Sequence, residues 1–180
     1  MIVLWVIGAI VLVFGLVVFR GAPYVPSHRR QVENAFDELY PLSSRDTVVD
    51  VGSGDGIVLR LARRRGARAV GYELNPMLVV ISRILAGRDQ KTTIKLADFW
   101  FASLPPQTTV VYCFLVSRDT QKMTVKLQQE ADRLGRPIQA ISYGAMLDVP
   151  AIKALGAHRL YQFVPRQTKN HKYNKGYEGK

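Results

Sequence analysis

The stretch that decides the fold is TVVDVGSGDGIVLRLARRRGARAVGYELN, residues 47–75. Its start, residues 47–51, is a β-branched run of the kind that forms a buried parallel strand. That strand ends at the glycine-rich turn 52–56, after which residues 57–65 have a helical pattern. Residues 70–75 then predict the next strand, with an acid near its end. A glycine turn between a strand and a helix lets a ligand approach the backbone and the N-terminal amides of the helix.

The spacing of the glycines indicates which ligand this turn suits. A dinucleotide site requires G-x-G-x-x-G, and the position of its third glycine is Ile57 here. The turn also has acids around it, Asp50 and Asp55, which would repel a pyrophosphate and attract a ligand with an ammonium and a sulfonium. Glu73, at the end of the second strand, is placed to accept the two ribose hydroxyls. These residues predict an S-adenosylmethionine site, and an ordinary glycine turn of an α/β protein is the alternative.

Composition sets broader limits on the chain. Its 180 residues predict one domain with a substantial core. The single cysteine, Cys113, excludes an intramolecular disulfide and lies in an apolar run, so we expect it to fill the core. Lys and Arg number 25 against 14 acids, a formal charge of +11. That excess favours nucleic acid or an acidic lipid surface without choosing between them.

Residues 1–19 carry no charged side chain and are almost wholly apolar. About 20 apolar residues cross a bilayer as a helix. A cleaved signal peptide would need a basic start and a small-x-small exit, so we expect a transmembrane anchor, with a buried core helix as the alternative. Basic residues follow the stretch: Arg20, His28, Arg29 and Arg30. The positive-inside rule places the N-terminus outside and the domain on the cytoplasmic side, or on the matrix side of a mitochondrial inner membrane.

The anchor is followed by a linker and lead-in helix, residues 20–44. Two prolines at 23 and 26 prevent the anchor helix from continuing, and residues 28–40 predict a helix with one apolar stripe. Tyr24 and Pro26 are candidates for a lid over cofactor or substrate, and a stiff spacer is the alternative. We expect the main domain at residues 45–165 and a basic, disordered tail at 166–180.

The remaining chain continues to alternate between strands and helices. Residues 76–86 predict a helix that begins at a proline, and residues 92–97 predict a third strand. Asp98, Phe99 and Trp100 follow it, at the end of the sheet where ligands bind. Asp98 could therefore accept the adenine amino group, with Phe99 or Trp100 beside the ring. A turn aspartate followed by core aromatics is the alternative. The alternation predicts an α/β, Rossmann-like fold with a mostly parallel sheet and helices on both faces.

Five short blocks of this sequence occur in an order that resembles a known family. They are PYVP at 23–26, QVEN at 31–34, VDVGSGDG at 49–56, GYELNP at 71–76 and DFW at 98–100. Together they resemble the class I, seven-strand S-adenosylmethionine-dependent methyltransferases. Behind an apolar N-terminal segment, the same order resembles the small membrane-bound protein-lysine methyltransferases, whose mitochondrial members modify the ATP synthase c subunit and the adenine nucleotide translocase. The block at 98–100 departs from the family's frequent Asp-Leu-Trp, and the stretch after residue 145 is short.

The resemblance implies S-adenosylmethionine as cofactor and a protein lysine, such as one in a membrane protein, as acceptor. It assigns the cofactor to the acid and glycines of the first loop, the acid of the second strand and the acid after the third. With their neighbours, the candidate cofactor residues are Asp50, Gly52, Ser53, Gly54, Asp55, Gly56, Glu73, Leu74, Asn75, Asp98 and Phe99. We expect no metal, and no histidine lies in a motif that identifies a catalytic residue.

Methyltransferases that act on DNA bases carry an Asn/Asp-Pro-Pro-aromatic box after the fourth strand. Here that strand ends with CFLVS, residues 113–117, so a flipped-base site has no support and we expect no nucleic-acid substrate. A methyltransferase of a small molecule or lipid, and a non-catalytic adenosyl-binding protein at the membrane, remain alternatives.

Overall fold

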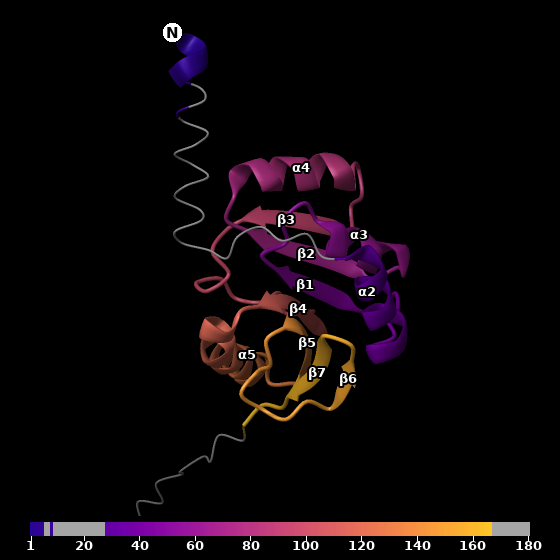
Figure 1. Cartoon of the computed structure of the whole chain (residues 1–180). Helices are drawn as coiled ribbons and strands as arrows, with labels where there is room; N and C mark the ends of the chain where they lie inside the picture. Colours follow the sequence, from indigo (N-terminus) through magenta and orange to yellow (C-terminus); the bar gives the residue numbers. More distant parts are fainter. Residues whose placement is uncertain (6–7, 9–27, 167–180) are drawn as a thin grey trace, which may run out of the picture.

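The computed structural model describes residues 1–5, 8 and 28–166, and in it seven strands form one sheet in the order β3-β2-β1-β4-β5-β7-β6 (Figure 1). The strands are β1 (Thr47–Val51), β2 (Arg68–Glu73), β3 (Thr92–Leu96), β4 (Val110–Leu115), β5 (Ile138–Gly144), β6 (Lys153–Leu155) and β7 (His158–Phe163). The first five are parallel, and β7 runs antiparallel between β5 and β6. The predicted Rossmann-like fold with a mostly parallel sheet is confirmed.

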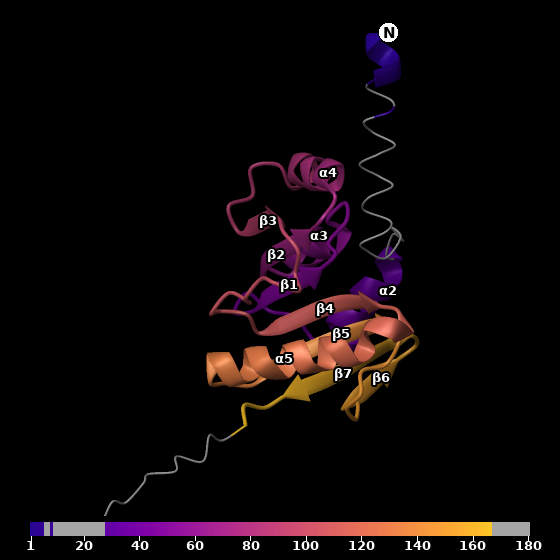
Figure 2. The ribbon, with the colours of Figure 1, turned by 90° about the vertical axis from the view of Figure 1, so that its left-hand side faces the viewer.

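Helices cover both faces of this sheet, as expected. The helical elements are α2 (Arg29–Asn34), the π-helical turn η1 (Ala35–Leu39), α3 (Ile57–Arg64), α4 (Pro76–Ala86), the 3₁₀ turn η2 (Ser117–Asp119) and α5 (Thr120–Leu134). Successive strand residues face opposite sides: Val48 joins the cluster beneath α2 and α3, and Val49 joins the one beneath α5. Figure 2 shows α5 on one side of β4 and β5, and α2 and α3 on the other.

The predicted helix 28–40 is present but is not α-helical throughout. After α2, the Tyr40 amide donates to the carbonyl of Ala35 at 2.9 Å, an i→i+5 bond. Its predicted apolar stripe is buried against the domain: Val32, Ala35, Phe36 and Leu39 are at most 3% exposed. The wider turn adds a residue to the helical repeat, which periodicity alone does not reveal.

Most of the predicted anchor, residues 1–19, lies outside the described residues. Its described start forms a helical turn over residues 2–5, with exposed apolar side chains. In the described part of the chain, no helix has both the length and the apolar character needed to cross a bilayer. Tyr24, Pro26 and tail residues 167–180 also lie outside it, whereas Arg166 is described and pairs with Asp132.

Gly71 allows the glycine loop to lie directly on β2. A Cβ at this position would come within 2.5 Å of the Ser53 hydroxyl oxygen and 2.7 Å of a methyl carbon of Leu59. Real Cβ atoms essentially never approach other atoms so closely. Loop, helix α3 and strand β2 therefore meet at a point where only a hydrogen fits.

We expect Gly71→Ala to destabilise the fold by roughly 1–3 kcal/mol, the usual cost of adding a methyl group to a filled core. Urea unfolding of the single variant measures this cost. Because two of the three close atoms belong to Ser53, Ser53→Gly in the same chain should restore part of the loss. Equal stabilities of the single and double variants would contradict this account.

Candidate functional site

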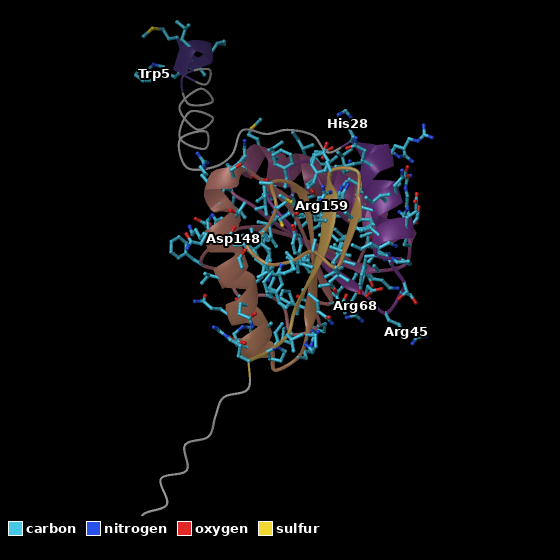
Figure 3. The ribbon with its side chains drawn as sticks, turned by 60° about the horizontal axis from the view of Figure 1, so that its bottom comes forward. Trp5, His28, Arg45, Arg68, Asp148 and Arg159 are labelled. Carbon is cyan, nitrogen blue, oxygen red and sulfur yellow. The ribbon has the colours of Figure 1, made fainter. Side chains whose placement is uncertain are left out.

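The carboxyl ends of β1, β2 and β3 lie at one edge of the sheet because the three strands are parallel neighbours. The glycine loop follows β1, Glu73 ends β2, and Asp98 lies two residues after β3. Arg45 and Arg68, which lie close to each other in Figure 3, are at the amino ends of β1 and β2 and so at the opposite edge. The fold therefore brings the predicted loop and the two predicted acids to the same edge.

The loop is held by backbone hydrogen bonds to the neighbouring strand. The amides of Gly52 and Ser53 both donate to the carbonyl of Tyr72, at 2.9 and 3.0 Å, and the Gly56 amide donates to the carbonyl of Ser53 at 2.8 Å. The loop glycines Gly52, Gly54 and Gly56 have φ of +72°, +54° and +81°. Residues other than glycine rarely adopt these angles, so the alternating glycines are a requirement of the turn.

Glu73 joins the two loops that follow β1 and β2. Its carboxylate accepts one hydrogen bond from the Gly54 amide and another from the Asn75 amide, both at 2.8 Å. Each carboxylate oxygen has a second lone pair, so both can accept from a ligand as well. Asn75 in turn begins α4, because its side-chain oxygen accepts from the Met77 amide at 3.0 Å. Leu74, between them, is exposed.

Asp50 is a buried carboxyl group among other acids. It lies in β1 beside Gly71 of β2 and Tyr112 of β4 and is 3% exposed. Burial raises the pKa of Asp50 well above its usual range, and the charges of Glu73 and Asp55 raise it further. A positively charged group bound beside Asp50 would relieve this repulsion.

Asp55 has a more local role than the other two acids. Its carboxylate accepts from the Ile57 amide at 3.1 Å, which caps the start of α3, and it pairs with Arg60 at 3.1 Å. Arg60 offsets part of this charge, whereas Asp50 and Glu73 form no ion pair within the described residues.

Two buried hydroxyl groups at the loop were not identified from the sequence as a pair. Within the described residues, neither Ser53 Oγ nor Ser82 Oγ has a hydrogen-bond partner. Ser82, in α4, lies so close to Gly56 that a Cβ there would be 2.2 Å from its hydroxyl oxygen. Ser82 gave no sequence signal, because a serine inside an apolar helix is ordinary.

Asp98 and Phe99 have different surroundings in the structure. The Asp98 carboxylate is partly exposed and accepts from the Trp100 amide at 2.9 Å. Phe99 is buried in the core, where its ring meets Tyr72 edge-on at 5.8 Å. Asp98 therefore lies where a ligand could reach it, while the contacts of Phe99 are those of core packing.

A row of rings continues across the sheet from β4. Phe114 and Tyr143 are half-buried neighbours with centroids 5.5 Å apart, and Tyr143 lies 4.7 Å from the ring of His158. His158 is buried with its Nε2 at 2.9 Å from the hydroxyl oxygen of Tyr112, and desolvation lowers the pKa of His158 to about 4. The imidazole is therefore neutral at physiological pH.

Comparison with known proteins identifies the family. The model of the ANTKMT methyltransferase domain matches residues 50–143, more than half of the chain. The chain belongs to this methyltransferase family. The match begins at Asp50 and includes the glycine loop, Glu73 and Asp98.

Curated relatives carry names of the same kind. The chain is 40% identical over 119 residues to the ATP synthase c-subunit lysine N-methyltransferase of Xenopus laevis, covering 64% of this chain and 51% of that one. It is 38% identical over 112 residues to the adenine nucleotide translocase lysine N-methyltransferase of Mus musculus, covering 60% and 48%. The chain thus spans about half the length of these relatives.

Solved structures share the fold. An RNA methyltransferase from Salinibacter ruber, in complex with S-adenosyl-L-homocysteine, is 26% identical with a TM-score of 0.68, and the match covers 81% of this chain and 97% of that one. This match covers more of the chain than the segment shared with the curated relatives.

We expect Asp50→Asn to stabilise the domain in the absence of ligand. Folding raises the pKa of Asp50. At pH values between the ordinary and the raised pKa, the folded state therefore binds more protons than the unfolded state. The free energy of unfolding then falls as the pH rises through this range. The amide cannot ionise, so the melting temperature of the variant should exceed that of the parent at neutral pH. The difference should vanish below about pH 3, where the carboxyl, with an ordinary pKa of about 3.9, is protonated in both states. A variant that melts lower at neutral pH would contradict the charge argument.

Proposed function

We propose that the protein is an S-adenosylmethionine-dependent methyltransferase that methylates a lysine of a protein acceptor and is held at a membrane by its apolar N-terminal segment. The observation that carries the proposal is the pair of buried acids, Asp50 and Glu73, beside a glycine loop in which Gly52 is exposed with open space next to it. Buried acids with few cations nearby fit a ligand that brings its own positive charges. The family match and the S-adenosyl-L-homocysteine bound to the Salinibacter protein support the same cofactor.

The described residues fit S-adenosylmethionine part by part. Glu73 has free lone pairs for the ribose hydroxyls, Asp50 offers a negative charge for the ammonium, and Asp98 is accessible to the adenine amino group. The unpartnered hydroxyl of Ser53 is a further polar group in the loop. When bound, the cofactor supplies a methyl group that its sulfonium already activates. The protein then has mainly to orient the acceptor for in-line attack.

A lysine acceptor suits the aromatic groups beside the loop. Phe114 and Tyr143 lie near the ends of β4 and β5, and β4 is the direct neighbour of β1. A lysine has an apolar stem and an unperturbed pKa of about 10.4, so it must lose a proton before it attacks. Half-buried rings would pack on the stem and, by excluding water, lower the pKa of the amine. The names of the curated relatives also favour lysine.

The proposal of membrane attachment rests on residues 1–19. Their length and lack of charge suit a single span, and the arginines that follow place the domain on the cytoplasmic side, or on the matrix side in a mitochondrion. The relatives are named for acting on a component of ATP synthase and on a translocase, and a tethered enzyme would meet such acceptors at the membrane.

RNA is the second candidate acceptor, and two observations favour it. The chain carries a formal charge of +11, and the similar Salinibacter protein is named an RNA methyltransferase. Against it stands the higher identity to the lysine methyltransferases. A third alternative, a small molecule or lipid, shares every cofactor contact.

A transfer assay separates these acceptors. The full chain is incubated with methyl-labelled S-adenosylmethionine and either native membranes or purified RNA, and the labelled product is separated into protein, lipid and nucleic acid. We expect the label in protein, as methyl-lysine by mass spectrometry. Label in RNA or lipid would mean that this molecule, and not a protein, is the acceptor. No label in any fraction would contradict the proposal that the protein is an enzyme.

We expect Glu73→Gln to weaken S-adenosylmethionine binding about tenfold or more, because hydrogen bonds to a charged acceptor contribute roughly 1.5–3 kcal/mol each. Calorimetric titration of the full chain measures the change. Glu130→Gln is the matched control, since Glu130 is also a buried acid that accepts from a backbone amide (Leu104, 3.1 Å) but lies in α5. Similar affinities of the parent and of Glu73→Gln for S-adenosylmethionine would contradict the assignment of Glu73 to the cofactor site.

We expect Tyr143→Ala to raise the KM for the protein acceptor about tenfold while leaving the affinity for S-adenosylmethionine within about twofold, because its ring packs on the acceptor rather than the cofactor. Tyr143→Phe keeps the ring and should retain most activity. If both variants lose activity equally, the hydroxyl has the decisive role and the packing argument is wrong.

A further inference from the structure

Helix α4 has apolar side chains on two sides. On one side Val79 and Ser82 are buried against the domain, with Ala86 packed beside them. The other side carries a second apolar stripe at i, i+3, i+4, i+7 and i+8, which we call the outer face of α4. It consists of Met77, Val80, Ile81, Ile84 and Leu85, which are between 41% and 72% exposed.

This exposure distinguishes α4 from the other helices that pack on the sheet. A helix that is apolar all round is normally buried on all sides. Single exposed apolar residues are ordinary, but a continuous stripe marks a surface that contacts something else. Helix α5 is longer, yet it has only one large apolar residue this exposed, Val125. Helix α4 lies beside β3, the strand at the outer edge of the sheet (Figure 1), and the side chains of its outer face are exposed there.

The surroundings of the outer face are basic. From residue 76 to residue 91 the chain carries three basic side chains, Arg83, Arg88 and Lys91. The one acid in that stretch is Asp89, which is paired with Arg63 from α3. An apolar stripe with a basic border has the chemistry of a helix that lies in the surface of an anionic membrane.

We propose that the outer face of α4 lies in the interfacial layer of a membrane that carries anionic lipid, with the basic residues around it at the headgroups. A second copy of the chain is the weaker occupant because the area is too small. Eleven residues at about 1.5 Å each make a ridge about 16 Å long and about 10 Å wide, well below the roughly 800 Å² per partner of a stable interface. A convex ridge also suits a fluid surface better than a preformed groove.

Docking through α4 would orient the candidate site. Helix α4 begins at Pro76, three residues after Glu73, so its first turn lies at the carboxyl edge of the sheet. The cofactor loop would then lie near the membrane surface, within reach of acceptor lysines just outside the bilayer. This inference concerns binding alone and stands or falls separately from methyl transfer.

Depth of insertion tests the proposal better than total vesicle binding, because the N-terminal segment would itself bind vesicles. Ile84→Cys is labelled with an environment-sensitive fluorophore, and Val125→Cys in α5 is the matched control, since both side chains are exposed. The native Cys113 is fully buried, and burial raises the pKa of its thiol, so an exposed cysteine reacts first. The full chain is then reconstituted into phosphatidylcholine vesicles with or without phosphatidylserine, each containing lipid with a quencher attached to its acyl chain.

We expect the label at residue 84 to be quenched and blue-shifted in vesicles with phosphatidylserine, and the label at residue 125 to remain in water. In a second experiment the fluorophore is placed at Val80→Cys instead. Adding Ile84→Glu to this variant should reduce the ratio of inserted to free helix about tenfold or more, whereas adding Val125→Glu should not change that ratio. Three results would overturn the proposal: equal quenching at 84 and 125, disulfide crosslinking of Ile84→Cys between two copies, or shielding of residue 84 that requires a co-reconstituted membrane protein.

Discussion

The two hydrogen bonds accepted by the Glu73 carboxylate hold the candidate site together. One comes from the loop after β1 and the other from the turn after β2, each at 2.8 Å, so a single side chain sets the distance between the two loops. The Gly54 amide would otherwise lie buried without a partner, which costs about 1–3 kcal/mol. The acid therefore has a structural role in the loop itself as well as its proposed role with the ribose.

Asp50, in contrast to Glu73, does not stabilise the free protein. Nothing in the folding of β1 requires an acid between two valines, and its burial beside Glu73 and Asp55 disfavours the charged form. A residue that opposes folding in the absence of ligand is most easily explained by what it does in the presence of one. A cation bound beside Asp50 would recover part of this free energy, and stability and affinity would then be coupled through this one carboxyl group.

The sequence predicted the fold well because its signals were local. The alternation of strands and helices, the glycine loop and the proline at the start of α4 each reflect a few adjacent residues. What it did not reveal depends on contacts between distant segments: the approach of Ser53 to Gly71, the hydroxyl of Ser82 beside Gly56, and the orientation of Phe99 into the core. Asp98 and Phe99 were both expected to contact the adenine, and only the packing of the loop shows that Phe99 is buried in the core while Asp98 stays partly exposed.

The position of β7 has a consequence for how the chain is made. The strand lies between β5 and β6, antiparallel to both, so residues 138–144 have no partner on that side until residues 158–163 arrive. On the ribosome, the parallel half of the sheet can assemble first while the edge of β5 stays open and prone to wrong pairing. Completion of the sheet therefore waits for the β6–β7 hairpin, which follows the whole parallel half in the chain.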